Sequence, residues 1–499
     1  MKKVVYIFIV LFLSFPKLLS AQSIQSLVNQ GLAKAYNMEL ESAEKIYNRI
    51  IDLYPEDPHG YYLIAQIYYW TYLGSKDKGE YQVFNKFAEL AQEKIEKILD
   101  EDNKNVKILH LAGNLQLFRA MANAVNESSV DAFWSSKNAV SYLEKAIQLN
   151  PKFYDAYLGL GLFDYAMSFV PEFLKWAVKL TGLTSDKERG LRYIKTAFNK
   201  GTLETTEAAF HLSKIYTDYL ADYDSAYYYI QSIIPRYPKN TLFLYQYAVS
   251  LIKGRELDKA IQPLNTVIRL NNKRFPQVTA LAHYRKGEVY FKKNQFKSAI
   301  KEYEAFLDLY KDIDFTGIAA YNIAISNKIL GNDDEYKKYL DLASDGNPDV
   351  YEDAYAMTKS EYFLKNDIDE IELQLVRIKN YIDYGRNRNA YDSLKVILPS
   401  IDNSDQKALA LSYLSESAFH LNKYAESVQA AENVLTVKSK IEKWTIPFSY
   451  FLQAKANWKV GAKNEARDFL SRAESENKFE FQDYIQSLIE NLKRKLKRA

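Results

Sequence analysis

The chain contains no cysteine, which excludes disulfide bonds, thiolate metal sites, a cysteine nucleophile and the lipid-modified cysteine of a bacterial lipoprotein. Glycine, with 17 residues, and proline, with 12, are scarce for a chain of 499 residues. Their scarcity favours long helices over a sandwich of strands joined by many turns. The composition therefore predicts an all-α protein.

Patterns typical of catalysis and cofactor binding are also missing. The sequence has no GxSxG, HExxH or P-loop pattern, and none of its five histidines has another three or four residues away. Acidic stretches such as NDDEYKK stand at turns and helix starts, where carboxylates suit the positive end of the helix dipole. We therefore predict a non-enzymatic protein with no catalytic residue, no metal site and no cofactor.

The most apolar internal stretch, residues 158–183, does not have the features of a membrane span. A proline and four charged residues interrupt it, so about 20 uncharged residues never occur in a row. Its GLG sequence lacks the third glycine and the preceding strand that a dinucleotide loop needs. We interpret the stretch as a first helix followed by an amphipathic insertion over residues 167–186, after which a second helix begins.

One face of this insertion carries Phe169, Phe173 and Trp176. Such a face covers a protein core in the simplest case, and it also suits a lipid surface or a partner helix. The sequence leaves these three roles open, and with them peripheral contact with a membrane.

The first 21 residues have the parts of a secretory signal: Lys2 and Lys3, an apolar run over residues 4–13, and the small-residue segment LLSAQS. We predict cleavage between Ala21 and Gln22; an uncleaved anchor is the alternative. Cleavage lowers the formal charge from +3 to about 0, so the mature chain has no overall attraction to nucleic acid. Export without disulfides indicates a bacterial envelope protein, periplasmic or secreted, with outer-membrane association left open.

Two segments share one repeated pattern of a small residue, aromatics around a polar turn, and a second small residue. They are GEVYFKKNQFKSAIKEYEAFLDLY, from Gly287, and SESAFHLNKYAESVQAAENVL, from Ser415. Ala226 and Ala260 lie 34 residues apart, the period of the tetratricopeptide repeat. The pattern resembles that repeat, in which small residues lie where the two helices of a pair touch.

The resemblance implies a right-handed α-α superhelix of about ten or eleven helix pairs. After the signal, we expect an N-terminal array over residues 22–345, with unusually long helices over 58–150. A C-terminal array over 346–499 would end in a basic capping helix. Residues 155–200 additionally resemble tetratricopeptide-like proteins of the mitochondrial outer membrane implicated in inclusion-body clearance.

In the repeat's family the first helices line a concave groove that holds peptides. By this resemblance, eight side chains would face the groove: Tyr245, Val249, Lys253, Tyr284, Glu288, Phe291, Lys292 and Tyr321. Tyr284 and Glu288 stand where chaperone-binding members carry a clamp of lysine and asparagine, which disfavours capture of an acidic C-terminal tail.

The sequence thus predicts an exported, non-enzymatic scaffold of a bacterial cell envelope that binds a protein or peptide, and not nucleic acid. The alternative is a periplasmic accessory protein that associates with a solute or lipid in transport or envelope assembly. The identity of the partner and the oligomeric state are not predicted.

Overall fold

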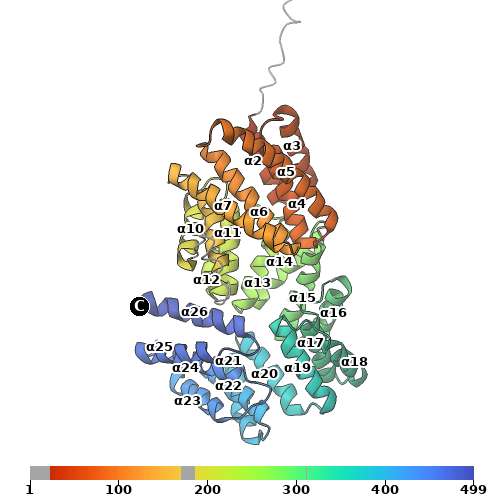
Figure 1. The fold of residues 1–499 in the computed structure, drawn as a ribbon. Coiled ribbons are helices and arrows are strands. Elements are labelled where there is room, and N and C mark those ends of the chain that lie inside the picture. Colours follow the sequence, from red (N-terminus) through yellow and green to blue (C-terminus); the bar gives the residue numbers. More distant parts are fainter. Residues whose placement is uncertain (1–22, 170–185, 311, 499) are drawn as a thin grey trace, which may run out of the picture. The chain divides into compact units, whose positions relative to one another are not determined.

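The computed structural model describes residues 23–169, 186–310 and 312–498 (Figure 1). All regular structure in these ranges is helical, as the composition predicted. The predicted signal with its cleavage site Ala21/Gln22, and Phe173 and Trp176 of the insertion, lie outside the described residues. The chain divides into two compact units, unit 1 (Met1–Ala197) and unit 2 (Phe198–Ala499).

The helices of unit 1 are labelled in Figure 1. They are α2 (Ile24–Tyr36), α3 (Leu40–Leu53), α4 (His59–Ser75), α5 (Lys78–Glu101), α6 (Val106–Val125), α7 (Ser129–Leu149), α8 (Ala156–Met167) and α10 (Lys187–Lys200), which ends just past the boundary.

Unit 2 begins with α11 (Thr205–Lys214), a π-helix η1 (Ile215–Tyr219), α12 (Tyr223–Gln231), α13 (Thr241–Lys253), α14 (Leu257–Leu270), α15 (Pro276–Lys292), α16 (Phe296–Leu309), α17 (Thr316–Leu330) and α18 (Asp333–Ala343). It continues with α19 (Tyr351–Lys365), α20 (Glu370–Asp383), α21 (Asn387–Ile397), a 3-10 turn η2 (Leu398–Ser400), α22 (Ser404–His420), α23 (Tyr424–Thr436), α24 (Thr445–Lys459), α25 (Lys463–Glu476) and α26 (Gln482–Arg498).

Consecutive helices pack in pairs along both units. The described helices form eleven pairs: α2/α3, α4/α5, α6/α7, α8/α10, α11/α12, α13/α14, α15/α16, α17/α18, α20/α21, α22/α23 and α24/α25. Helix α19 is single and packs on α17 and α18, while α26 packs on α24 and α25. The predicted α-α superhelix of ten or eleven pairs is confirmed. The boundary predicted between residues 345 and 346 falls inside unit 2 and stays a prediction.

Small residues lie at the helix crossings, as the repeat pattern predicted. A Cβ atom on Gly287 of α15 would come within 2.7 Å of the Tyr303 ring on α16. Tyr303, Ala299 and Phe306 are fully buried beside this contact. The small residue therefore lets the two helices approach while larger side chains fill the space on either side.

At the crossing of α8 and α10 two glycines bring the helix backbones themselves close together. A Cβ on Gly161 would lie 2.8 Å from the carbonyl oxygen of Gly190, and a Cβ on Gly190 would lie 2.7 Å from that of Gly161. Beside them the Arg189 guanidinium donates to both carboxylate oxygens of Asp164, at 2.6 and 2.7 Å. The charge that interrupts the apolar stretch thus joins these two helices as a bidentate ion pair.

Helix lengths separate the middle of unit 1 from the rest of the array. Helices α5, α6 and α7 have 24, 20 and 21 residues, whereas α13 and α14 have 13 and 14. Side-chain caps fix where they begin: Asp77 accepts from the Glu80 N–H before α5, and Asn105 from the Ile108 N–H before α6. The extra turns extend beyond a standard repeat and form the walls of a cleft described below.

The basic C-terminal segment forms the amphipathic helix α26. Ile485, Ile489, Leu492 and Leu496 recur at helical spacing and are buried against the C-terminal core. The lysines and arginines lie on other faces, where Lys493 pairs with Glu474 at 2.6 Å. The helix therefore covers the apolar end of the array.

Candidate functional site

The first helices form the inner layer of unit 2. Successive first helices, such as α13 and α15 or α22 and α24, contact one another more closely than successive second helices do. Helix α15 also contacts α20, from a pair farther along the chain. This inner layer contains all eight of the groove residues predicted from sequence.

Three of these predicted residues are buried within the helix layer. Tyr284, Val249 and Tyr321 keep only 4%, 6% and 6% of their surface exposed. The Tyr284 ring lies 5.2 Å from those of both Phe306 and Phe315, and burial raises its pKa. These side chains contribute mainly to the core and offer little area to a ligand.

The five other predicted residues keep part of their surface, and four of them have polar partners inside the layer. Lys253 donates to Asp218 at 3.1 Å, and Tyr245 accepts from Arg285 at 3.4 Å. Glu288 accepts from Arg285 at 2.8 Å and from Lys292 at 2.7 Å.

Burial opposes the charge of Glu288, but Lys292 and Arg285 outweigh it and lower the pKa of Glu288 to about 2. The fifth residue, Phe291, packs edge-on against Phe296. Lysines 253 and 292 are therefore already paired with carboxylates of the protein.

A second group of charges crosses the same inner layer. Arg255, just after α13, donates to Glu416 of α22 and lies 2.8 Å from Nε2 of His420. Burial raises the pKa of Glu416, but Lys379 and Arg255 outweigh it and lower this pKa to about 2. Burial, followed by the charge of Arg255, lowers the pKa of His420 to about 3. These contacts tie an early pair of unit 2 to a late one.

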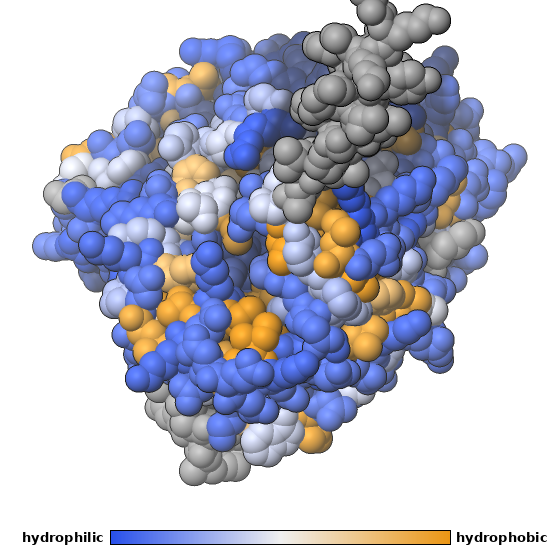
Figure 2. All heavy atoms as spheres, turned by 90° about the horizontal axis from the view of Figure 1, so that it is seen from above, coloured by the Kyte–Doolittle hydropathy of each residue, from blue (hydrophilic) through white to orange (hydrophobic). Residues whose placement is uncertain are grey.

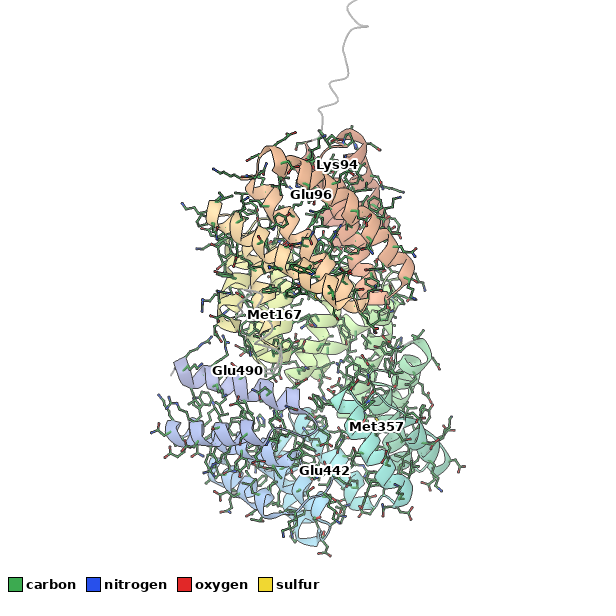
Figure 3. The ribbon with its side chains drawn as sticks, in the orientation of Figure 1. Lys94, Glu96, Met167, Met357, Glu442 and Glu490 are labelled. Atoms are coloured by element: carbon green, nitrogen blue, oxygen red, sulfur yellow. The ribbon has the colours of Figure 1, made fainter. Side chains whose placement is uncertain are left out.

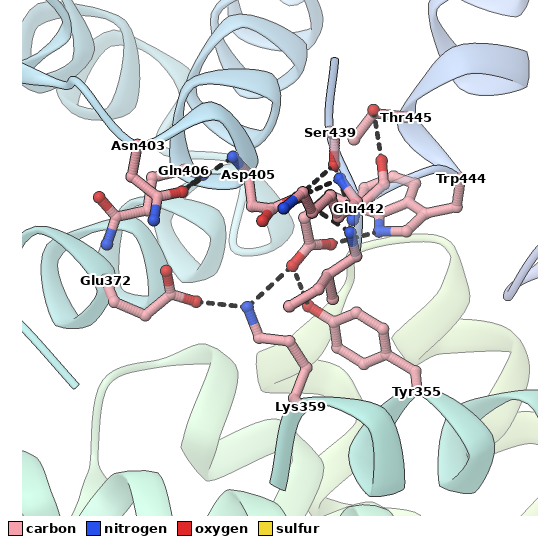
Figure 4. Close-up of polar contacts among 12 residues, drawn as sticks. Tyr355, Lys359, Glu372, Asn403, Asp405, Gln406, Ser439, Glu442, Trp444 and Thr445 are labelled. Carbon is pink, nitrogen blue, oxygen red and sulfur yellow. Dashed lines mark hydrogen bonds and ion pairs between the residues drawn. The ribbon is translucent and has the colours of Figure 1, made fainter. Parts of the chain in front are cut away.

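A buried lysine joins α19 to α20 and to the turn before α24 (Figure 4). Lys359 is 3% exposed, and its Nζ lies 2.7 Å from Glu372 and 2.8 Å from Glu442. Glu442 also accepts from the indole N–H of Trp444 at 2.7 Å and from the Tyr355 hydroxyl at 3.3 Å. One cation thus holds two carboxylates inside the array.

Sequence reasoning placed a boundary between residues 345 and 346 and missed this lysine. The spacing along the helix could have revealed it. Tyr355, Lys359 and Phe363 follow at intervals of four, so they share one face of α19. Two aromatics on a buried face place the lysine between them inside the protein. Its Nζ lies 6.0 Å from the Tyr355 ring and 5.0 Å from that of Phe363.

In unit 1 the long helices enclose a polar cleft of about 440 Å³. Helix α5 contributes Asn85, Glu89, Gln92 and Glu96, the last labelled in Figure 3, and α6 contributes Gln116, Arg119 and Asn123. Helix α7 contributes Asp131, Trp134, Ser135, Asn138 and Tyr142. A second hollow of about 520 Å³ shares Asn85 and Glu89 with the cleft and extends it along α5.

The Arg119 side chain is partly buried in this cleft. Burial lowers the pKa of Arg119, against the attraction of Glu89 and Glu96. Within the described ranges, Arg119 has no carboxylate within ion-pair distance, and the side chains of Asn85 and Asn138 form no hydrogen bond. These groups remain available to a ligand. The sequence analysis noted the long helices but not the cleft.

The described parts of both units offer neither a metal site nor a membrane span. No group of three or more histidine, aspartate or glutamate side chains in those parts is arranged to hold a metal ion. No helix there combines the length and the apolar character needed to cross a bilayer. Hydrophilic residues cover most of the face seen in Figure 2, with hydrophobic ones in smaller areas. Phe169, the described residue of the predicted insertion surface, is 48% exposed.

The helix pairs, their small-residue crossings and the inner layer of first helices define a tetratricopeptide-like α-solenoid, a class that serves as scaffolds for protein–protein interaction and is generally non-catalytic. More particularly, residues 78–314 match the family model described as Iml2/Tetratricopeptide repeat protein 39. The match confirms the tetratricopeptide resemblance and covers the cleft-forming helices. A comparison with curated proteins gives no significant match.

Solved structures, among them two of tetratricopeptide repeat proteins, are similar to the chain at low identity. One from Parabacteroides merdae is 14% identical, with 57% of this chain and 99% of that one covered and a TM-score of 0.26. The P58(IPK) TPR domain is 17% identical, with 82% and 94% covered and a TM-score of 0.21. NprR in complex with its cognate peptide NprX is 16% identical, with 58% and 84% covered and a TM-score of 0.26.

Proposed function

We propose that the chain is an exported, non-enzymatic scaffold of a bacterial cell envelope that binds a protein or peptide along the first helices of unit 2. The observation that carries this proposal is the inner layer of first helices, which in tetratricopeptide proteins is the ligand-binding layer. Export rests on the signal pattern of residues 1–21, and the assignment to a bacterial envelope rests on export combined with the absence of cysteine.

The residues of this layer that stay partly exposed form the proposed contact region for the partner. The side chains of Lys253 and Lys292 are 34% and 25% exposed, and Tyr245 is half-buried beside them. Because Asp218 and Glu288 already neutralise the two lysines, an acidic tail would have to displace internal ion pairs. The proposed partner is therefore held mainly by aromatic and main-chain contacts rather than by free positive charge.

Affinity purification after gentle crosslinking tests the scaffold. The tagged full chain is recovered from its native cell beside a Tyr245→Ala/Lys292→Ala double variant. A matched control, Lys297→Ala/Lys301→Ala, changes two exposed lysines of α16, the second helix of the same pair.

The proposal expects a protein partner whose recovery falls about tenfold or more in the first variant and is unchanged in the control. Equal recovery from all three proteins would contradict the groove assignment. Export is tested separately, by fractionation and by mass spectrometry of the N-terminus; the proposal expects the mature chain to start at or near Gln22. An intact Met1 in the cytoplasmic fraction would contradict it.

A further inference from the structure

The α5–α7 cleft has no part in the scaffold function proposed above, and its lining differs from that of most binding pockets. Small-molecule sites are mainly apolar with a few polar groups. Here amide, carboxylate and guanidinium side chains supply most of the lining, and Trp134 and Tyr142 supply the aromatic surface. Such a lining suits a ligand that carries many hydrogen-bonding groups over a small volume.

The polar groups of the cleft are of the type that pairs with hydroxyls. A hydroxyl donates one hydrogen bond and accepts others, and a side-chain amide likewise offers donors and an acceptor together. Asn85 and Asn138 present both from opposite walls, and Arg119 adds donors that have no partner in the described chain. Neighbouring hydroxyls on a sugar ring match such groups without any net charge on the ligand.

Trp134 provides an exposed aromatic surface in the same cleft. Its side chain is 53% exposed although it belongs to the lining, and Phe133 packs edge-on beside it with 5.4 Å between ring centroids. The Lys137 ammonium lies 5.4 Å from the indole ring and holds it further. An exposed indole can pack against the apolar C–H face of a sugar ring.

Charge and size narrow the class of ligand. Over the cleft and the adjoining hollow together, the acids Glu89, Glu96 and Asp131 are matched in number by the cations Arg119, Lys78 and Lys86, which favours a ligand without net charge. The cleft volume of about 440 Å³ lies within the usual range of about 300–1,000 Å³ for small-molecule sites. The adjoining hollow of about 520 Å³ lengthens the space, as a chain of several rings requires.

We propose that unit 1 binds a neutral oligosaccharide in the α5–α7 cleft, with Trp134 as the stacking surface and Asn85, Arg119 and Asn138 as hydrogen-bonding groups. The ligand would be an uncharged chain of hexose, pentose or N-acetylhexosamine units. This binding is independent of the partner contact on unit 2.

Isothermal titration calorimetry of the chain from Gln22 onward tests the proposal. The probes are maltohexaose, cellohexaose, mannohexaose, xylohexaose and chitohexaose, each titrated at low and at high salt. The variants are Trp134→Ala and Arg119→Met, and Trp458→Ala on α24 is the matched control. Thermal unfolding of each variant shows whether the fold is retained.

At least one probe is expected to bind with an affinity that does not change with salt. Trp134→Ala and Arg119→Met should each lower that affinity about tenfold or more, and Trp458→Ala should leave it unchanged. Failure of all five probes, or full affinity in Trp134→Ala, would overturn the proposal. Salt-dependent binding of an oligolysine peptide that is lost in Trp134→Ala would also overturn it, because the acidic cleft would then be a site for basic peptides.

Discussion

The Nζ atom of Lys359 lies 2.8 Å from Oε1 of Glu442, although the two residues are 83 positions apart in the chain. Glu372 accepts from the same ammonium at 2.7 Å. The pair therefore joins α19 to the turn before α24 through a single buried cation. Taking charges out of water is costly unless they are paired, so loss of one partner should have a large effect.

Lys359→Ala is expected to lower the free energy of unfolding at neutral pH by about 3–5 kcal/mol, because it leaves two buried carboxylates without a cation. Burial raises the pKa of Glu442 even with Lys359 present, so the loss should shrink as the solution is acidified and Glu442 takes up a proton. Urea unfolding at neutral and mildly acidic pH measures both effects. Lys365→Ala, at an exposed position of the same helix, is the control and should change little. Equal stability of the two variants would show that the buried ion pair does not stabilise the fold.

Gly190→Ala is expected to destabilise unit 1 by about 1–3 kcal/mol, since the new Cβ would meet backbone atoms that cannot move aside. It would lie 2.7 Å from the Gly161 carbonyl oxygen and 2.8 Å from the Tyr165 nitrogen. Gly79→Ala near the start of α5 is the control, because its Cβ would meet only the carboxylate of Asp77, at 2.9 Å. Chemical unfolding compares the two. A harmless Gly190→Ala substitution would mean that α8 and α10 do not cross as closely as described.

Stability should decrease as the pH falls from about 7 to 5, because two histidines are held neutral in the fold. Burial lowers the pKa of His211 to about 4, and burial together with Arg255 lowers that of His420 to about 3, from an ordinary value of 6.5. The unfolded chain therefore binds more protons than the folded chain below about pH 6.5. The free energy of unfolding is highest above this pH and falls as the pH is lowered through it. Each histidine should account for only about 1 kcal/mol of this fall in the free energy of unfolding, because both rings keep some contact with water. A His211→Gln/His420→Gln variant should flatten the profile, and an unchanged slope in urea unfolding across this range would contradict the assignment.

The pairs and crossings could be predicted from the sequence because they depend on short, regular spacings. Gly287 and Tyr303 belong to one repeat, and their helical registers fix which faces meet. The ion pairs could not be predicted in the same way. Arg255 and Glu416 are 161 positions apart, and whether they meet depends on small rotations added over many repeats.

The burial of the predicted groove residues could not be predicted either, because it depends on contacts beyond the repeat pattern. Position within the repeat places Tyr284 on the first helix, but its burial depends on Phe306 and Phe315, which close over it. The cleft of unit 1 could be predicted from the sequence only in part. The excess length of α5 and α7 is visible in the sequence, whereas the meeting of Asn85, Arg119 and Trp134 around one space requires the packed helices.

The most direct test of the scaffold is site-specific photocrosslinking in the native cell. A photoreactive phenylalanine replaces Tyr245 on the inner layer in one strain and Lys301 on the outer helix α16 in another. The account predicts a discrete crosslinked protein at position 245, identified by mass spectrometry in the envelope fraction, and none at position 301. The same set of products at both positions, or no product at 245 in a folded chain, would contradict it.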